Sequence, residues 1–478
     1  MFERYKVIHF VGIGGIGMSG IAEVLYNLGY EVTGSDLRDT ETTRRLKGQG
    51  IKVFIGHDAD NIDDAHVVVI SSAVPESNPE VIEAKRRSIP VIPRAEMLAE
   101  LARLKYSILV AGAHGKTTTT SLISTILAHA GFDPTVIIGG KLKATGSNAR
   151  LGQGEFLVAE ADESDGSFLK LSPTIAVATN IDREHMDFFK TMDYLKEAFI
   201  SFLNKIPFYG VSIVCMENEH LRELLPSLHR RCITYGFGSE SEIYAGNIKK
   251  GIMSVSFEVT YKGKDMGRFD LPLLGDHNIL NSLAAIGVAL ELQIDVESIK
   301  EALKNFEGIQ RRFEFKGEAK GIKVFDDYGH HPTEIQAILK AAKEGLFNNG
   351  NKKSEIKNQK GKRLFVLFQP HRYTRTKDLL NEFSASFRDA DSLVLMDIYP
   401  AGEKPIEGIN SGILFEQIKR RGHGNAVYMS DREEALRHII LHIRKGDMLL
   451  TLGAGDVWKV GEEILHRLKS EGERLRCG

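Results

Sequence analysis

Short apolar runs alternate with segments of helical length along the whole chain. Near the N-terminus the runs read VIHFVGI, EVTGSD, IKVFIG, HVVVISSAV and IPVIPR. Each run is rich in β-branched residues and is bounded by Gly, Pro or polar residues. This alternation predicts α/β units, with an open, doubly wound, Rossmann-like parallel sheet in the first block.

The same pattern continues in two further blocks. The second contains YSILVAGAHGKTTTT, FLVAEAD, TIAVATNID and VSIVCM, which read as buried parallel strands of a P-loop ATPase-like α/β domain. From about Ile243 to Leu274 the pattern alternates as in antiparallel hairpins, and a helical segment follows. The third block, with KVFDDYG, RLFVLFQP, SLVLMDIYP and DMLLTLGAG, reads as a second Rossmann-like domain. We therefore expect three domains, at residues 1–106, 107–312 and 313–478.

Composition narrows the class of protein. Of 478 residues, 42% are apolar and 26% charged, which is typical of a globular protein of several domains. The net charge of -2 argues against a nucleic-acid partner. The three cysteines lack metal-ligand spacing, and there is neither a signal peptide nor an apolar membrane span. We expect a cytoplasmic protein without membrane insertion, as a monomer or a homodimer. The polar stretch Asn348–Lys362 reads as a surface loop or insertion.

A glycine-containing turn joins the strand YSILVA to the next helix. It contains Gly112, Ala113, His114, Gly115, Lys116, Thr117 and Thr118. Backbone N–H groups and the helix N-terminus can hold phosphate there, the lysine can neutralise its charge, and the first threonine can reach Mg²⁺. The turn is shorter than the usual phosphate-binding loop, so the alternative is a tight strand–helix turn with an exposed lysine.

A second glycine turn follows the first strand. Gly12, Gly14, Gly15 and Gly17 resemble a dinucleotide-binding fingerprint, and Asp36 stands where a ribose-binding carboxylate would be. Such a loop serves any diphosphate. The alternative is helix–strand packing without a ligand.

Polar clusters follow several predicted strands. Glu160, Asp162, Glu163 and Asp165 end one strand, and their oxygens suit Mg²⁺, although a solvated acidic loop has the same composition. His185, after the next strand, is either a metal ligand or a turn residue.

In the third block, DDYGHHP raises a metal or general-base hypothesis, with a fixed turn as the alternative. The arginines of QPHRYTR suit a carboxylate ligand, with a solvated basic loop as the alternative.

In this order, the short glycine-lysine loop, EADESDGS, NxDxxHxD, GxHNxxN and DDYxHHP resemble the Mur ligases of peptidoglycan synthesis. Members of this family bind a UDP-sugar in the first domain, ATP in the second and an amino acid in the third. GIGGIGMSG, DDYGHHPTEI, FQPHRYTRT and DIYPAGE resemble the branch that adds L-alanine to UDP-N-acetylmuramic acid through an acyl phosphate. The recycling branch, which adds a tripeptide, is the alternative; its first loop usually reads closer to GICGTFMG.

The resemblance implies a role for each matching residue. The UDP-sugar would contact Gly14, Gly15, Ile16, Gly17, Asp36, Ser71, Ser72 and Ala73. ATP would contact Gly112–Thr118, Asn278, Asn281, Arg312 and Asp327. The metal ligands would be Thr117, Glu160 and His185, for two Mg²⁺ ions or Mn²⁺. L-Alanine would contact Tyr328, His330, Arg372 and Arg375, and the catalytic residues would be Lys116, His185, Arg312 and His330.

Some alternatives stay open at this level. His330 is our hypothesis for the base that deprotonates the alanine amine, and a phosphate oxygen is its rival. Several Mur ligases carry a carbamylated lysine between the metals; Lys205 lies in the right region, but we do not assign it. A dinucleotide-dependent oxidoreductase, or an ATP-binding regulatory module without activity, would explain fewer of the motifs.

Overall fold

The computed structural model describes residues 6–71, 73–139, 149–251, 253–347 and 362–474. Two predictions fall outside these residues: the site residue Ser72 and nearly all of the loop Asn348–Lys362. The chain forms two compact units, which are described separately. The first comprises Met1–Asn247, Phe257–Phe269 and Leu280–Glu307, and the second Ile248–Ser256, Asp270–Ile279 and Gly308–Gly478.

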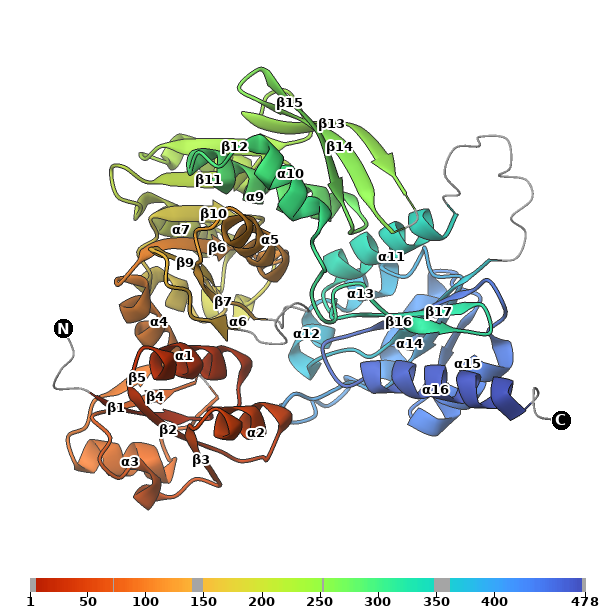
Figure 1. Ribbon diagram of the computed structural model, residues 1–478. Coiled ribbons are helices and arrows are strands. Elements are labelled where there is room, and N and C mark those ends of the chain that lie inside the picture. Colours follow the sequence, from red (N-terminus) through yellow and green to blue (C-terminus); the bar gives the residue numbers. More distant parts are fainter. Residues whose placement is uncertain (1–5, 72, 140–148, 252, 348–361, 475–478) are drawn as a thin grey trace. The chain divides into compact units, whose positions relative to one another are not determined.

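The N-terminal sheet has five parallel strands in the order β3-β2-β1-β4-β5 (Figure 1). The strands are β1 (Val7–Val11), β2 (Glu31–Asp36), β3 (Lys52–Ile55), β4 (Val67–Ile70) and β5 (Val91–Pro93). The helices are α1 (Ile16–Asn27), α2 (Glu41–Gly48), η1 (Ala59–Ile62), α3 (Pro79–Arg86) and α4 (Arg94–Ala102). The strand order reverses direction at β1, so the turn after β1 stands where doubly wound sheets bind ligands. The predicted doubly wound sheet is confirmed.

The central sheet has ten strands in the order β15-β14-β13-β12-β11-β10-β6-β9-β7-β8. They are β6 (Tyr106–Ala111), β7 (Thr135–Ile137), β8 (Ala149–Arg150), β9 (Phe156–Glu160), β10 (Ile175–Ala178), β11 (Val211–Cys215), β12 (Cys232–Gly236), β13 (Ile243–Lys250), β14 (Val255–Tyr261) and β15 (Lys264–Leu271). The helices are α5 (Lys116–His129), η2 (Ser167–Lys170), α6 (Met186–Phe189), α7 (Met192–Asn204), α8 (Glu219–Leu224), η3 (Leu225–Ser227), α9 (Asp276–Glu291) and α10 (Val296–Lys304).

Strand β6 lies between β9 and β10 and is parallel to both. Val110 pairs with Glu160 and Ala111 with Ala178, so all three strands end at the same level. The predicted hairpin at the far side of this sheet is also present. Lys262 and Gly263, with φ of 48° and 76°, join β14 to β15, as a two-residue hairpin turn requires.

The C-terminal sheet has six strands in the order β16-β17-β21-β18-β19-β20. They are β16 (Glu314–Ala319), β17 (Ile322–Asp327), β18 (Leu364–Phe368), β19 (Ser392–Leu395), β20 (Ala426–Tyr428) and β21 (Met448–Leu452), of which only β16 is antiparallel to its neighbour. The helices are α11 (Pro332–Phe347), α12 (Tyr373–Asp378), α13 (Leu380–Ala385), α14 (Ser411–Arg420), α15 (Arg432–His442) and α16 (Trp458–Arg474).

Both faces of this last sheet are buried. Along β21, Leu450 and Leu452 pack in one apolar cluster and Leu449 in the cluster on the opposite face. Successive side chains of a strand point to opposite faces, so a run that is apolar at every position needs cover on both sides. None of the helices in the described residues is long and apolar enough to span a lipid bilayer.

Candidate functional site

The turn between β6 and α5 has the backbone of a phosphate-binding loop. Gly112 and Gly115 have φ of 139° and 82°, a region that favours glycine. A Cβ at Gly112 would lie 2.1 Å from Thr179 Oγ1, and one at Gly115 would lie 2.5 Å from Asn281 Oδ1. The loop therefore excludes side chains at both glycines, which leaves its backbone accessible to a ligand.

Lys116 opens helix α5 and turns back over the loop. Its Nζ donates to the carbonyl of Gly112 at 2.6 Å and to the two carboxylate oxygens of Glu163 at 2.8 and 2.9 Å. Burial by itself lowers the pKa of Lys116, but the charges of Glu163 and Asp162 outweigh it and raise that pKa. The ammonium group is therefore charged, and an acidic loop 47 residues away in sequence holds it.

The end of β10 braces the same loop. The backbone N–H of His114 donates to Asn180 Oδ1 at 2.8 Å, and Thr179 Oγ1 donates to the carbonyl of His114 at 2.7 Å. His114 Nε2 lies 2.8 Å from Asp182 Oδ2, and the N–H of Ala113 donates to the carbonyl of Asn180. Thr117 and Thr118 are each 7% exposed at the start of α5. The loop is thus fixed on the side facing β10.

A possible metal site lies beside the lysine. One ligand atom each from Glu163, Glu184 and His185 falls within 4.8 Å of the others. His185 has φ of 57°, which a residue other than glycine adopts rarely, and its Nε2 lies 3.9 Å from Glu163. Two carboxylates and an imidazole fit Mg²⁺ or Mn²⁺. Glu160 is placed differently, because its Oε1 accepts the N–H of Gly139 at 2.6 Å.

The sequence pointed to four acids of this loop, Glu163 among them, but the ligand role was given to Glu160 alone, and Glu184 was missed. All the carboxylates of that loop have the same chemistry, and only the direction of each side chain separates them. Lys205, which we had left unassigned, lies just after α7 and donates to the carbonyl of Leu169.

The two asparagines of α9 lie one turn apart, near its start. Asn281 Oδ1 accepts the Thr119 hydroxyl at 3.2 Å and faces Gly115. Asn278 Nδ2 donates to the carbonyl of Leu274 at 2.8 Å and is 8% exposed. The structure thus places Asn281 at the phosphate-binding loop, and the predicted ATP contacts of both asparagines stay predictions.

The N-terminal glycine loop is held by the end of β2. The N–H of Gly14 donates to Asp36 Oδ2 at 2.9 Å, and a Cβ on Gly14 would lie 2.7 Å from that oxygen. Ile16 begins α1 and is half-exposed, as is fitting at an open loop. Ser71 and Ala73 follow β4, the neighbour of β1, and a Cβ on Gly12 would lie 3.6 Å from Ser71 Oγ.

Arg94 is a further candidate beside this loop that the sequence did not single out. A Cβ on Gly17 would lie 2.9 Å from Arg94 Nη1, and Nη2 of the same arginine lies 3.1 Å from Asp162 Oδ2. Its guanidinium therefore stands between the N-terminal glycine loop and the acidic loop, both within the first unit.

In the C-terminal unit, the candidates collect at the carboxyl ends of β17, β21 and β18. Asp327 pairs with Leu452, and Leu452 with Phe368, so the three strands end together. Asp327 accepts the N–H groups of Phe313 and Gly329 at 2.7 and 2.6 Å. Burial raises its pKa to about 7, although Arg312 opposes the shift.

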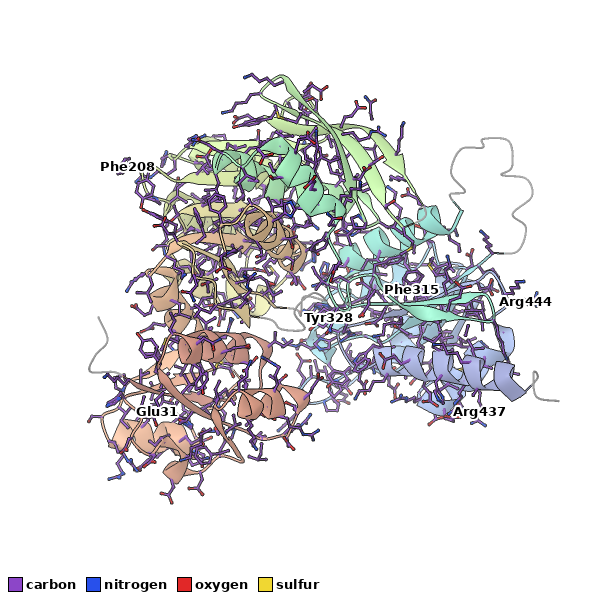
Figure 2. The ribbon with its side chains drawn as sticks, viewed as in Figure 1. Glu31, Phe208, Phe315, Tyr328, Arg437 and Arg444 are labelled. Atoms are coloured by element: carbon purple, nitrogen blue, oxygen red, sulfur yellow. The ribbon has the colours of Figure 1, made fainter. Side chains whose placement is uncertain are left out.

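Glu334 organises the turn that carries His330. Its carboxylate accepts the N–H of His330 at 3.0 Å and lies 3.7 Å from Nη1 of Arg312. The Arg312 guanidinium also lies 5.4 Å from the ring of Tyr328, labelled in Figure 2, whose own ring is 5.4 Å from that of His330. Arg312, Tyr328 and His330 thus lie in one group, and their predicted contacts with ATP and L-alanine stay predictions.

His371 completes this group, although we had not predicted a role for it. Its ring is 5.7 Å from that of His330 and is stacked on Tyr399 at an interplanar angle of 8°. Its Nδ1 is 3.3 Å from Arg375 Nη1. Burial, with the nearby charges of His330 and the arginines, lowers the pKa of His371 to about 3, so the ring is neutral and can accept from Arg375. Arg372 is exposed at the start of α12.

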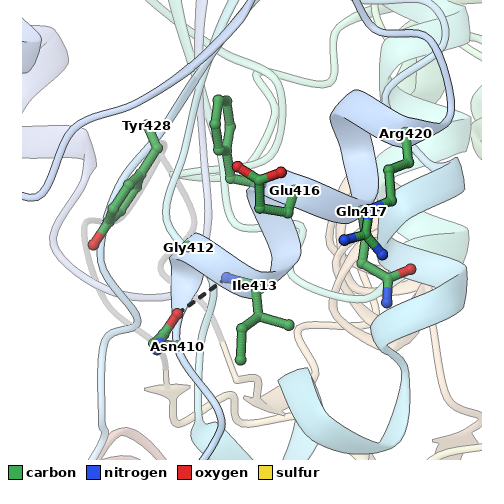
Figure 3. Close-up of a pocket in the computed structure, with 8 residues that line it drawn as sticks. Asn410, Gly412, Ile413, Glu416, Gln417, Arg420 and Tyr428 are labelled. Atoms are coloured by element: carbon green, nitrogen blue, oxygen red, sulfur yellow. Dashed lines mark hydrogen bonds between the residues drawn. The ribbon is translucent and has the colours of Figure 1, made fainter.

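A hollow in the C-terminal unit does not coincide with these residues. Figure 3 shows it beside α14, with Asn410 Oδ1 accepting the N–H of Ile413. Its volume is about 490 Å³, and its lining consists of Asn410, Gly412, Ile413, Phe415, Glu416, Gln417, Arg420 and Tyr428. None of the predicted site residues belongs to it.

The fold and the site define a multidomain nucleotide-binding enzyme. It has three α/β sheets, a glycine-lysine loop on the central one and a carboxylate–imidazole cluster beside that loop. Models of the Mur ligase family match nearly the whole chain: the catalytic domain at residues 7–106, the middle domain at 110–289 and the glutamate ligase domain at 311–455. The chain belongs to the Mur ligase family, which confirms the resemblance seen in the sequence.

Individual relatives agree with this assignment. A UDP-N-acetylmuramate–L-alanine ligase of Geobacter sp. (strain M21) is 54% identical over 99% of this chain and 100% of its own length. The enzyme of the same name from Geobacter sulfurreducens is 53% identical over 98% and 99%.

Solved structures give the same result. A UDP-N-acetylmuramate–alanine ligase of Thermotoga maritima has a TM-score of 0.81 at 29% identity, over 97% of this chain and 99% of that one. A murein peptide ligase from Psychrobacter arcticus has a TM-score of 0.70 at 25% identity, over 97% and 98%. The predicted three-domain α/β fold is confirmed by the first of these matches; the exact domain bounds stay a prediction.

Proposed function

We propose that this chain joins L-alanine to the lactyl carboxylate of UDP-N-acetylmuramic acid, with hydrolysis of ATP to ADP and phosphate, in peptidoglycan synthesis. The observation that carries the proposal is the length of the match. Alanine-adding relatives are more than half identical over essentially all of this chain, so the candidate sugar, nucleotide and amino-acid sites are all included. The murein peptide ligase of Psychrobacter arcticus, at 25% identity, is more distant than these alanine-adding relatives.

The first step is transfer of the γ-phosphoryl group to the lactyl carboxylate. A carboxylate oxygen attacks phosphorus, the bond to the ADP oxygen breaks, and an acyl phosphate forms. Both reactants are anions, so positive charge must stand between them. Lys116, charged and fixed on the loop, supplies one cation. The resemblance to Mur ligases implies that Arg312 would supply a second when the substrates are bound.

In the second step the alanine amine attacks the acyl carbon and phosphate leaves. The amine must be neutral, so its proton has to pass to a base. We propose His330 for this role, because its ring lies in the same group as Tyr328 and His371. Arg375 would hold the alanine carboxylate, with Arg372 at the exposed side.

The metal would be held by Glu163, Glu184, His185 and the hydroxyl of Thr117. Glu160, the ligand that the sequence resemblance implies, accepts the N–H of Gly139 instead. When bound, Mg²⁺ would neutralise phosphate charge during the transfer. The donor set fits this ion, because it offers carboxylate oxygens and an imidazole nitrogen within 4.8 Å of one another. In the structure Glu163 pairs with Lys116. When the ligands bind, Lys116 would turn to the nucleotide phosphates and Glu163 to the metal.

The setting of the enzyme is part of the same proposal. We place it in the cytoplasm, as a monomer or homodimer, with three domains at residues 1–106, 107–312 and 313–478. UDP-sugar would bind the first, ATP the second and L-alanine the third.

The experiment is a phosphate-release assay with identification of the product by mass. Release should require UDP-N-acetylmuramic acid, ATP, Mg²⁺ and L-alanine together. Glycine and L-serine should be poor substrates, because one methyl or hydroxyl group changes binding by about 1–3 kcal/mol. Release with a tripeptide but not with L-alanine would identify the recycling activity instead, and oxidation of NAD(P)H would identify an oxidoreductase.

A further inference from the structure

Glu80 is a carboxylate buried in the core of the N-terminal domain. It lies in the first turn of α3, after the cap residue Asn78, and is 0% exposed. Its Oε2 accepts the hydroxyl of Ser35 at 2.6 Å, and its Oε1 accepts Asn61 Nδ2 at 2.6 Å. No role in the reaction has been assigned to it so far.

Two imidazoles face the same carboxylate. His57 Nδ1 lies 3.3 Å from Glu80 Oε2 and 2.9 Å from Ser35 Oγ. His9 is fully buried, with Nδ1 2.8 Å from Thr33 Oγ1 and Nε2 3.7 Å from Glu80. Burial by itself raises the pKa of Glu80, but the nearby His9 and the hydrogen bonds from Ser35 and Asn61 outweigh it and lower that pKa. Glu80 is therefore ionised. Its carboxylate accepts hydrogen bonds from Ser35 and Asn61, and the imidazoles of His57 and His9 lie beside it.

A buried, ionised carboxylate is unfavourable unless its partners are fixed. A hydrophobic side chain of similar volume would hold α3 on the sheet as well. What the carboxylate adds beyond packing is the position of its hydrogen-bond donors, Ser35 and Asn61.

Ser35, which donates to Glu80, is connected to the N-terminal glycine loop by backbone hydrogen bonds. The carbonyl of Ser35 accepts the N–H groups of Gly12 and Ile13 at 2.8 and 2.9 Å. The next residue, Asp36, accepts the N–H of Gly14 at 2.9 Å. The carbonyl of Asp36 accepts the N–H of Gly56, which precedes His57. The end of β2 is therefore the support of the glycine loop, and Glu80 is the support of the end of β2.

We propose that Glu80 is a positioning residue for the UDP-sugar site: through Ser35 it fixes the end of β2 and, with it, the glycine loop after β1, both of which carry the UDP-sugar contacts. The proposal rests on the proposed function, because it assumes that a sugar diphosphate binds this loop. The carboxylate itself, 0% exposed, does not contact the ligand.

The test is Glu80→Gln, measured by calorimetric binding of UDP-N-acetylmuramic acid to the full chain and by steady-state kinetics. The amide keeps the size of the side chain but turns one acceptor into a donor, which faces either Ser35 or Asn61. We expect the dissociation constant and the KM for the sugar nucleotide to rise about tenfold or more. The kcat at saturation and the KM for ATP should stay within about twofold, since the central loop is not supported by Glu80.

Glu83→Gln is the matched control. Glu83 lies in the same helix, one turn further on, and pairs with Arg86 and Arg87 at the surface. Its removal should leave the affinity for the sugar nucleotide unchanged. Ser35→Ala is the second variant, in case Glu80→Gln folds poorly. It should raise the same dissociation constant, and the effects of Ser35→Ala and Glu80→Gln should be less than additive because they break one hydrogen bond.

The outcomes distinguish a failure of the proposed function from a failure of the positioning role of Glu80. A parent chain that does not bind UDP-N-acetylmuramic acid would contradict the proposed function. A parent that binds, with Ser35→Ala and folded Glu80→Gln binding equally well, would overturn the positioning role. Equal loss of affinity for the sugar nucleotide and for ATP would overturn it too, because a general loss of folded protein would explain that result.

Discussion

Substitution of Lys116 by methionine should slow phosphoryl transfer and lower stability without changing the backbone of the phosphate-binding loop. Methionine keeps most of the length of the side chain and removes its charge. In the structure the Lys116 ammonium lies 2.8 Å from a carboxylate oxygen of Glu163, and the two side chains are 16% and 3% exposed. At an effective dielectric constant of about 20, unit charges at that distance attract by about 6 kcal/mol.

This attraction sets the size of two effects. In the ligand-free protein, Glu163 would lose its partner, and breaking a buried pair in this way destabilises by about 3–5 kcal/mol. With ATP bound, the ammonium would instead face phosphate oxygens. If half of the attraction is expressed in the transition state, the barrier rises by about 3 kcal/mol and the rate falls by about a hundredfold or more.

The assay is phosphate release with UDP-N-acetylmuramic acid and L-alanine at saturation, combined with thermal unfolding with and without Mg²⁺. Mg²⁺ should raise the melting temperature of Lys116→Met more than that of the parent, because the metal can replace the missing positive charge beside Glu163. Lys170→Met is the control: Lys170 pairs with Glu96 at 3.0 Å, but the side chains are 46% and 44% exposed. It should change stability by at most about 1 kcal/mol and activity by less than about twofold.

The reasoning would be refuted by a Lys116→Met enzyme that keeps more than about a third of the parental turnover and unfolds at the parental temperature. Equal stabilisation of parent and variant by Mg²⁺ would contradict the proposed metal position at Glu163. The assignment of Gly112–Thr118 as the ATP-binding loop would then depend only on the measured loss of turnover.

Three further predictions concern the C-terminal unit. Asp327 holds its proton up to a pH of about 7 in the native state but releases it above about 4 when unfolded, so native stability should fall as the pH rises from about 4 to about 7. This change in the free energy of unfolding amounts to up to about 4 kcal/mol between about pH 4 and about pH 7, and it should be absent in Asp327→Asn. Melting temperatures of parent and variant that change with pH in parallel would contradict the raised pKa of Asp327. Arg375→Lys should raise the KM for L-alanine about tenfold and leave that for the sugar nucleotide unchanged, because an ammonium group cannot bind a carboxylate in bidentate fashion; equal KM values would place the carboxylate elsewhere. His371→Asn should leave the acid limb of the pH–rate profile in place, because the pKa of His371 is lowered to about 3, and a displaced limb would show that His371 titrates during turnover.

The local features of this protein could be read from its sequence. Short apolar runs between segments of helical length located most of the strands, because a parallel strand that is covered on both faces is apolar at nearly every position. The glycines of the two loops could be recognised because a backbone that bends sharply and leaves its N–H groups accessible excludes side chains, as the 2.1 Å approach at Gly112 illustrates. The family followed from several such local motifs in a fixed order.

The partnerships within the sites were decided only by the tertiary structure. The sequence offered several equivalent acids in one loop, and the ordering of β9, β6 and β10 selected Glu163 as the partner of Lys116. The link from Glu80 to the glycine loop runs through Ser35, 45 residues away, and carries no motif. The physical reason is that sequence spacing fixes a side chain's direction only within one helix or strand, whereas distances between elements depend on how the whole chain packs.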